Sequence, residues 1–233
     1  MIQVQPFANL GRFQNEWLNA RYHFSFGQYR DRARMGVSNL VVWNDDEIAP
    51  GKGFDPHPHK DMEIITYVRQ GAITHKDSLG NVGRTEAGDV QVMHAGTGIT
   101  HAEYNVEAEP TRLFQIWIHP DTPGAKPGWG ARAFPKTGAA GLTALADGRP
   151  GADGSALPLN ANAAVFAGTL QAGQTITHRF GPGRVGYLVA ATGSVTVNGV
   201  AAGARDGVTI AEESEITIIA SAESELVLVE VRA

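Results

Sequence analysis

Short β-rich runs separated by glycine and proline recur along the whole chain, and they constrain its fold more than any other feature. The 28 glycines and 12 prolines are spread over the 233 residues. They separate runs rich in Val, Ile, Thr and aromatic residues, at positions 39–43, 63–68, 89–93, 112–118, 187–191, 194–200, 207–211, 215–220 and 225–231. Many short strands with regular turn signals predict an all-β sandwich or barrel. Only residues 15–20 and 139–146 are expected to form short helices.

The stretch 120–164 differs from the rest, because it is rich in proline and glycine and poor in β-branched residues. So long a connection is unusual inside one compact domain, so we place a domain boundary within it. The predicted domains are residues 1–135 and 136–233. The two halves are weakly alike: ITYVRQGAIT in the first half and GYLVAATGSVT in the second place Gly71 and Gly193 in matching turns. A duplicated β-barrel is one interpretation of this pattern.

Composition excludes several kinds of site. The chain has no cysteine, which excludes disulfides, thiolate zinc sites, iron–sulfur clusters and a cysteine nucleophile. Any metal must therefore be held by His, Asp, Glu or water. A net charge of −5 argues against a nucleic-acid-binding domain. The sequence has neither a secretory signal pattern nor the roughly 18 consecutive apolar residues of a membrane span, so a cytoplasmic protein is expected.

Two pairs of polar residues at the same spacing indicate a metal site. They are His57 with His59, and His101 with Glu103. In a β-strand such i, i+2 residues point to the same face, about 7 Å apart. Two neighbouring strands with these pairs would aim three imidazoles and one carboxylate at one point. That donor set suits Fe, Mn, Ni, Cu or Zn, and it leaves one or two positions of a five- or six-coordinate metal open for catalysis.

Other residues near these pairs have two interpretations each. His94 precedes the turn that leads to His101, so it is either a supporting residue of the site or a turn residue. Gln115, Trp117 and His119 share one face of a predicted strand, which either lines the barrel cavity or faces solvent. His23 lies in the aromatic segment YHFSF, where a packing role is favoured over a place at the pocket mouth.

The spacing of glycines and ligand residues resembles the two cupin motifs. The first motif is matched by Gly51, His57, His59, Glu63 and Gly71, and the second by Gly88, Gly96, His101 and Asn105. Longer segments, YHFSFGQYRD, NDDEIAPGKGFDPHPHKDMEIITYV and QVMHAGTGITHAEYN, resemble the pirin family and in particular its short bacterial members. The resemblance covers most of the chain and weakens after about residue 140.

This resemblance implies two tandem cupin barrels, with one divalent transition metal in the N-terminal barrel. Iron(II) is the first expectation, with Mn, Ni, Cu or Zn as alternatives. The ligands carried over from the family are His57, His59, His101 and Glu103, and Glu103 is also the candidate catalytic residue. Glu63 is its rival, because ordinary cupins use the glutamate of the first motif as a ligand.

The resemblance also implies two functions from different classes. Some pirins are similar in activity to quercetin 2,3-dioxygenase, which opens a flavonol ring with O₂ and releases carbon monoxide. The alternative is an iron-binding, redox-sensitive regulatory module that acts through a protein partner. We expect the enzyme, with a flavonol-like aromatic substrate, O₂ as co-substrate, and no direct contact with nucleic acid or membrane.

The second half is expected to lack the metal site. Aligning Gly193 on Gly71 places Arg179 and Gly181 opposite the first two histidine ligands. His178 is then a lone histidine, which is more often a packing or surface residue than a ligand. We therefore predict a C-terminal barrel that binds no metal.

Overall fold

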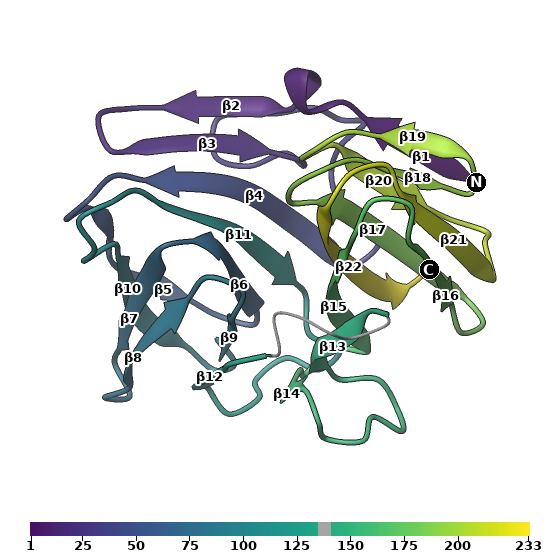
Figure 1. The fold of residues 1–233 in the computed structure, drawn as a ribbon. Helices are drawn as coiled ribbons and strands as arrows, with labels where there is room; N and C mark the ends of the chain where they lie inside the picture. Colours follow the sequence, from purple (N-terminus) through teal and green to yellow (C-terminus); the bar gives the residue numbers. More distant parts are fainter. Residues whose placement is uncertain (135–140) are drawn as a thin grey trace.

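The computed structural model describes residues 1–134 and 141–233, and strands make up nearly all of its regular structure (Figure 1). The N-terminal barrel packs a seven-stranded sheet against a four-stranded one. In spatial order the large sheet consists of β12 (Gly128–Arg132), β9 (Val90–His94), β6 (Glu63–Gln70), β11 (Thr111–Ile118), β4 (Leu40–Ile48), β3 (Leu18–Tyr22) and β2 (Gly11–Gln14). The small sheet consists of β5 (Gly53–His59), β10 (Ile99–Tyr104), β7 (Ala72–Asp77) and β8 (Val82–Glu86).

The C-terminal barrel repeats this arrangement of a seven-stranded and a four-stranded sheet. Its large sheet consists of β1 (Ile2–Gln5), β20 (Gly207–Ile210), β17 (Arg184–Ala190), β22 (Ser224–Arg232), β15 (Ala163–Leu170), β13 (Thr143–Asp147) and β14 (Leu157–Pro158). Its small sheet consists of β16 (Thr175–Arg179), β21 (Glu215–Ala220), β18 (Val195–Val197) and β19 (Val200–Ala202). β1 lies antiparallel to β20, so the first strand of the chain joins the C-terminal barrel. The prediction of an all-β fold with two barrels is confirmed.

Both faces of the large N-terminal sheet are buried, and they have different neighbours. Successive residues of a strand point to opposite faces. On β4, Trp43 and Asp45 face the C-terminal barrel. Asp45 accepts hydrogen bonds from Arg205 of that barrel and from Arg69 of β6. Asn44 and Asp46 point to the other face, into the N-terminal barrel. One face of the sheet therefore joins the barrels, and the other lines a cavity.

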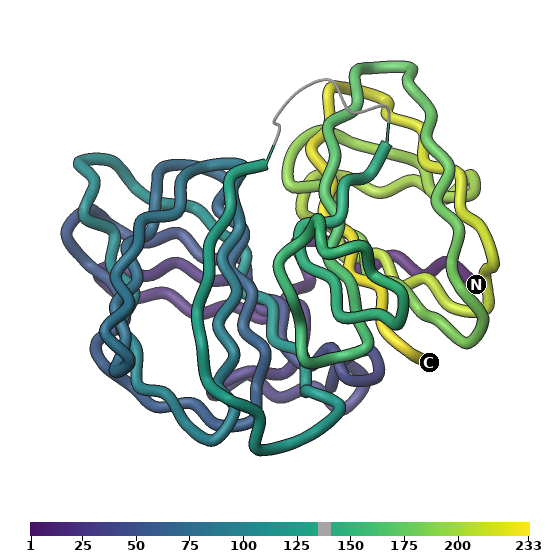
Figure 2. The backbone as a smooth tube through the Cα atoms, turned by 90° about the horizontal axis from the view of Figure 1, so that it is seen from below, coloured from purple at the N-terminus to yellow at the C-terminus, as the bar shows by residue number. Residues whose placement is uncertain are grey.

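The two barrels lie side by side (Figure 2). Their large sheets share one hydrophobic core. Trp43, Phe114 and Ile116 come from the N-terminal barrel, while Tyr187 and Val229 come from the C-terminal one, and all five are at most 1% exposed. Burying one such large side chain contributes about 1.5–3 kcal/mol. The junction is thus built like the interior of a single domain.

The two expected helices are replaced by other structure. The helix predicted for 15–20 is wrong: Asn15 Oδ1 accepts hydrogen bonds from the backbone N–H groups of Trp17 and Leu18, and β3 follows directly. Leu18 and Ala20 point inward with the period of two that belongs to a strand. In the second segment, the part from Thr143 onward belongs to β13.

The remaining predictions of this kind concern residues 135–140. The start of the second expected helix, at 139–140, and the boundary between residues 135 and 136 lie outside the described residues. One short 3-10 helix, η1 (Phe7–Asn9), interrupts the strands near the start of the chain. No helix in the described part of the chain has the length and apolar character needed to cross a membrane.

Candidate metal centre

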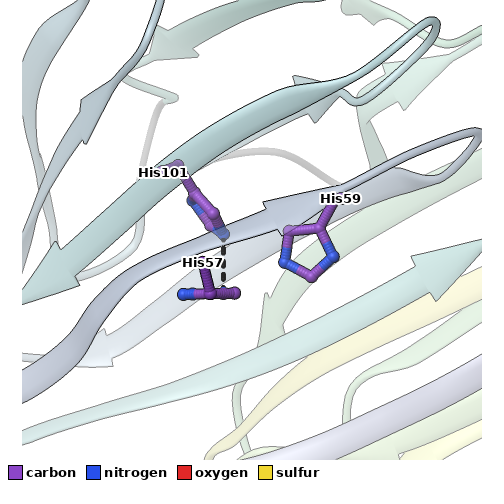
Figure 3. A group of neighbouring side chains, drawn as sticks. All are labelled: His57, His59 and His101. Carbon is purple, nitrogen blue, oxygen red and sulfur yellow. Dashed lines mark hydrogen bonds between the residues drawn. The ribbon is translucent and has the colours of Figure 1, made fainter.

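Strands β5 and β10 bring three of the predicted ligands together. They lie antiparallel, with His57 directly opposite His101, and His59 lies two residues further on the same face of β5. The Nε2 atoms of His57 and His101 are 3.1 Å apart. Figure 3 shows the three imidazole rings close to one another, projecting from two neighbouring strands, and their candidate ligand atoms lie within 4.8 Å of one another. The period of two in each strand is what places these rings on one face.

Glu103 lies next to this group, on β10. The strand register shifts between His101 and Glu103, and the Glu103 side chain is 2% exposed. Its carboxylate accepts hydrogen bonds from Gln91 Nε2 at 2.6 Å, from Thr66 Oγ1 at 3.2 Å, and from Gln115 Nε2. Candidate ligand atoms of Glu103, His101 and His75 lie within 4.8 Å of one another. The four predicted ligands therefore fall into two overlapping groups that share His101.

Hydrogen bonds at the Nδ1 atoms of His57 and His101 orient the two rings so that each Nε2 atom faces the site. The Nδ1–H of His57 donates to the Asp55 carbonyl oxygen at 2.7 Å, which leaves the His57 Nε2 lone pair free. His101 Nδ1 lies 3.4 Å from His75 Nδ1, and His75 Nε2 lies 3.1 Å from Asp77 Oδ2. When His75 donates to Asp77, its Nδ1 accepts from His101, and the His101 Nε2 lone pair points at the site. Such outer partners fix the tautomer of metal-binding histidines.

Burial keeps two of the rings neutral. It lowers the pKa of His59 to about 4, with a further contribution from the neighbouring His57 ring. Burial also lowers the pKa of His101 to about 3, assisted by His57 and His59. The neutral imidazole is the form that binds metals, so both rings are in that form at pH 7. Burial raises the pKa of Glu103, although hydrogen bonds from Gln115 and Thr66 oppose the shift.

The residues present fit a metal ion. His59 Nε2 is buried and has no hydrogen-bond partner within the described ranges. Buried polar atoms without partners are rare in proteins, and a metal ion bound beside these three imidazoles would give this nitrogen a partner. Three imidazoles and a carboxylate form a donor set suited to a first-row transition metal.

The site opens into a cavity with aromatic walls. The cavity has a volume of about 420 Å³, within the range of roughly 300–1,000 Å³ typical of small-molecule sites. His57, His59 and Glu103 contribute to its surface. The aromatic side chains that line it are Trp17, Tyr22, Phe26, Phe54 and Trp117. A flat aromatic molecule suits such walls, since it can stack against the rings.

Gln115 and Trp117 also line this cavity. Of the two alternatives for their strand face, the cavity and the solvent, the structure shows the cavity. His119, which follows β11, is exposed. His23 is fully buried, and its Nδ1 lies 2.9 Å from the Tyr187 hydroxyl at the barrel junction, which agrees with a packing role.

Glu63 and His94 form a separate pair at the junction between the barrels. The Glu63 carboxylate lies 2.6 Å from His94 Nδ1 and accepts a hydrogen bond from the Asn160 backbone N–H at 2.9 Å. Cross-strand pairing places Glu63 opposite His94 in the large sheet, whereas the three histidines come from the small sheet. Glu63 thus joins the two halves of the protein.

Sequence reasoning assigned no role to His75, which is fully buried and stacked on Trp129 with ring centroids 4.9 Å apart. A signal was present, because His75 and Asp77 form a third i, i+2 pair like the two that define the site. In the second barrel, His178 Nε2 lies 3.0 Å from Glu230 Oε2, beside an ion pair between Arg184 and Glu230.

Comparisons with known proteins agree with this architecture. Residues 4–118 match the family model described as Pirin, and residues 148–231 match the one described as quercetinase C-terminal cupin domain. A pirin-like protein of Caulobacter vibrioides is 56% identical over 231 residues, which cover 99% of this chain and 99% of that protein. A quercetin 2,3-dioxygenase of Escherichia coli is 39% identical over 229 residues, which cover 98% of this chain and 97% of that one.

A solved structure has the same fold along its whole length. The crystal structure of a bacterial pirin from Escherichia coli in complex with nickel(II) superposes with a TM-score of 0.93 at 37% identity, and the match covers 100% of this chain and 99% of that one. The motif resemblance, the two barrels and these full-length relatives lead to one conclusion: the chain belongs to the pirin family, with two cupin domains.

Proposed function

We propose that this chain is a metal-dependent dioxygenase of the quercetin 2,3-dioxygenase type, which opens the ring of a flavonol-type substrate with O₂. The observation that supports it best is the position of the candidate ligands: His57, His59 and Glu103 face an aromatic-lined cavity of about 420 Å³. A closed structural site would leave no such space for a substrate beside the metal. The Escherichia coli relative named quercetin 2,3-dioxygenase adds support for the substrate class.

We assign His57, His59, His101 and Glu103 as the ligands of one divalent transition metal. Iron(II) is our first candidate, and Mn, Ni, Cu or Zn are alternatives with the same donor preference. The nickel(II) complex of the Escherichia coli relative is consistent with this range. A metal held there would stabilise a deprotonated substrate as a Lewis acid and favour electron transfer toward O₂.

Glu103 is the residue we assign to move the substrate proton. Its carboxylate lines the cavity, and a carboxylate held in a fixed position there can act as a general base. Gln91 and Gln115 donate hydrogen bonds to its two oxygens and so hold the group in one orientation. A hydroxyl proton of the substrate would pass to one of these carboxylate oxygens.

The aromatic residues position the substrate and exclude water. The rings of Trp117 and His59 meet edge to face with centroids 5.0 Å apart, and Trp117 also packs against Phe26 at 5.5 Å. These contacts place a rigid aromatic wall directly beside a candidate ligand. A planar substrate held against it would keep a fixed orientation toward His57 and His59, which raises the rate of reaction.

Incubation of the Fe(II)-loaded protein with quercetin in air tests the proposal. We expect the flavonol absorbance band to disappear and carbon monoxide to be released, whereas a His57→Ala, His101→Ala double variant should do neither. Absence of turnover with iron, manganese, nickel and copper would contradict the enzyme. It would instead favour the iron-binding regulatory module with a protein partner.

A further inference from the structure

Two buried oxygen atoms on β4 face the cavity. Asn44 is 5% exposed and Asp46 is 2% exposed, and both side chains line the cavity. The Oδ1 atom of each is buried and lacks a hydrogen-bond partner among residues 1–134 and 141–233. Buried polar atoms in proteins are almost always paired, so two adjacent exceptions in a ligand cavity indicate a bound group that completes them.

These oxygens belong to a different wall of the barrel from the histidines. Asn44 and Asp46 belong to the large sheet, whereas His57 and His59 lie on β5 of the small sheet. In the strand register Asn44 has Tyr22 on one side and Gln115 on the other, and both of these also line the cavity. A flat molecule with one edge at the histidines can therefore present another polar group to Asn44 and Asp46.

The chemistry of the pair calls for a hydrogen-bond donor, and hydroxyl groups are the donors that a flavonol-type substrate carries. A carbonyl-type oxygen of Asn44 and a carboxyl oxygen of Asp46 both accept hydrogen bonds, so they require a donor. Burial raises the pKa of Asp46 well above its usual range, and the nearby carboxylates of Asp45 and Glu103 add to the shift. A carboxyl group that keeps its proton both donates and accepts, which again matches a hydroxyl.

We propose that Asp46, with Asn44 beside it, is a specificity-determining residue that hydrogen-bonds a ring hydroxyl of the substrate. This hydroxyl is remote from the neighbouring hydroxyl and carbonyl groups that a flavonol would present to the histidines. The proposal rests on the proposed function and adds to it the substrate class: an aromatic molecule with a free hydroxyl on the far ring system. A site built to bind a hydroxyl rejects the analogue without it, because the buried acceptors are then left unpaired.

Equilibrium binding under nitrogen tests this without turnover. The probes are quercetin and 3-hydroxyflavone, which has the same hydroxyl and carbonyl pair but no hydroxyls on its other rings. Quenching of tryptophan fluorescence in the Fe(II)-loaded protein reports binding, because Trp17 and Trp117 line the cavity. We expect the wild type to bind quercetin roughly 5- to 150-fold more tightly than 3-hydroxyflavone, the range that one buried hydrogen bond allows.

Asp46→Leu should abolish this preference while the affinity for 3-hydroxyflavone stays within about twofold, since Leu has the same branched skeleton of four heavy atoms and lacks only the acceptor oxygens. Asp46→Asn keeps an oxygen acceptor at the same place and should retain most of the preference. If Asp46→Leu does not fold, Asn44→Leu is compared in the same way and should lower the preference.

Three results have clear meanings. An unchanged preference in folded Asp46→Leu overturns the proposal and leaves the proposed function intact. Equal loss of affinity for both probes also overturns it, because the residue would then shape the cavity rather than read a hydroxyl. A wild-type protein that binds neither probe contradicts the flavonol-type substrate itself, and this proposal with it.

Discussion

At the scale of single residues, the candidate ligand His101 has partners outside the proposed ligand set. His75 lies between His101 and Asp77, and it is held flat against Trp129 by stacking, with an interplanar angle of 7°. Asp77 in turn accepts from the backbone N–H groups of Leu79 and Asn81. A chain of hydrogen bonds thus runs from a backbone turn to the His101 ring. Partners of this kind set both the orientation and the basicity of a ligand.

His75→Phe tests this chain, because it keeps the ring that stacks on Trp129 and removes both nitrogens. We expect Fe(II) affinity to fall by roughly 10- to 100-fold, the usual effect of losing such a partner. Titration under nitrogen measures it, with the melting temperature of the metal-free protein as the check on folding. Lys76→Ala is the matched control, since Lys76 is exposed on the other face of β7. Equal affinities in His75→Phe and the control would show that His75 has no such role.

At the scale of elements, the close approach of β5 to β10 is what assembles the site. Gly53 lies at the start of β5, and a Cβ atom there would be 2.1 Å from the backbone oxygen of Glu103. A side chain at this position would push the strands apart at the end where Glu103 lies. Glycine is therefore required by the pairing of the two strands, independently of any left-handed turn.

Gly53→Ala should lower both the melting temperature and the Fe(II) affinity. We expect a loss of about 1–3 kcal/mol in the free energy of unfolding, typical of overpacking against a fixed backbone. Gly128→Ala is the control, because its Cβ would lie 3.8 Å from the nearest atom, in ordinary contact. If both variants bind Fe(II) as the wild type does, the strand approach is not what limits the site.

The C-terminal barrel has its own buried charge, on β22. Glu230 is 1% exposed, and its pKa is lowered: burial acts to raise it, but hydrogen bonds from His178 and Arg184 outweigh this. Because the folded pKa lies below the ordinary value of 4.5, the ionised group stabilises the fold above that pH. This contribution is lost as the pH falls through the folded pKa.

Denaturant unfolding at pH 7, 5, 4 and 3 should therefore separate the wild type from Glu230→Gln. The variant is expected to be less stable at pH 7 and to lose less stability between pH 5 and pH 3. Its metal content should stay unchanged, because His178 and Glu230 are assigned to packing of the second barrel. Parallel pH profiles would mean that Glu230 does not contribute in this way.

Sequence patterns predict the strands and the candidate ligand pairs, but they predict neither the junction between the barrels nor the pairing of β1 with β20. The sequence could predict that His57, His59 and His101 lie together, because a period of two fixes their face within each strand. The barrel junction could not be predicted, because both faces of the large sheets are buried. An apolar residue such as Trp43 therefore does not indicate whether it faces the barrel interior or the other barrel. The pairing of β1 with β20 was also invisible, because it joins segments about 200 residues apart with no local signal.

At the scale of the whole molecule, the shared core predicts that the two barrels unfold together. Ile116 is fully buried in the cluster formed by both large sheets. Ile116→Ala should cost about 2–5 kcal/mol and lower the temperature of a single cooperative transition. Calorimetry measures this, with Ile219→Ala as the control, because Ile219 is 42% exposed on the C-terminal barrel. Two separate transitions, of which only one shifts in Ile116→Ala, would contradict the shared core.

Anaerobic Fe(II) titration tests the proposed metal centre, whose ligands are His57, His59, His101 and Glu103. Wild-type protein should bind one Fe(II) per chain. Glu103→Gln should bind Fe(II) more weakly and lose most quercetin turnover, since it removes an anionic ligand and the candidate base. Glu63→Gln should retain more metal, because Glu63 is bonded to His94 and Asn160 at the barrel junction. A greater loss of Fe(II) affinity in Glu63→Gln than in Glu103→Gln would contradict the assignment.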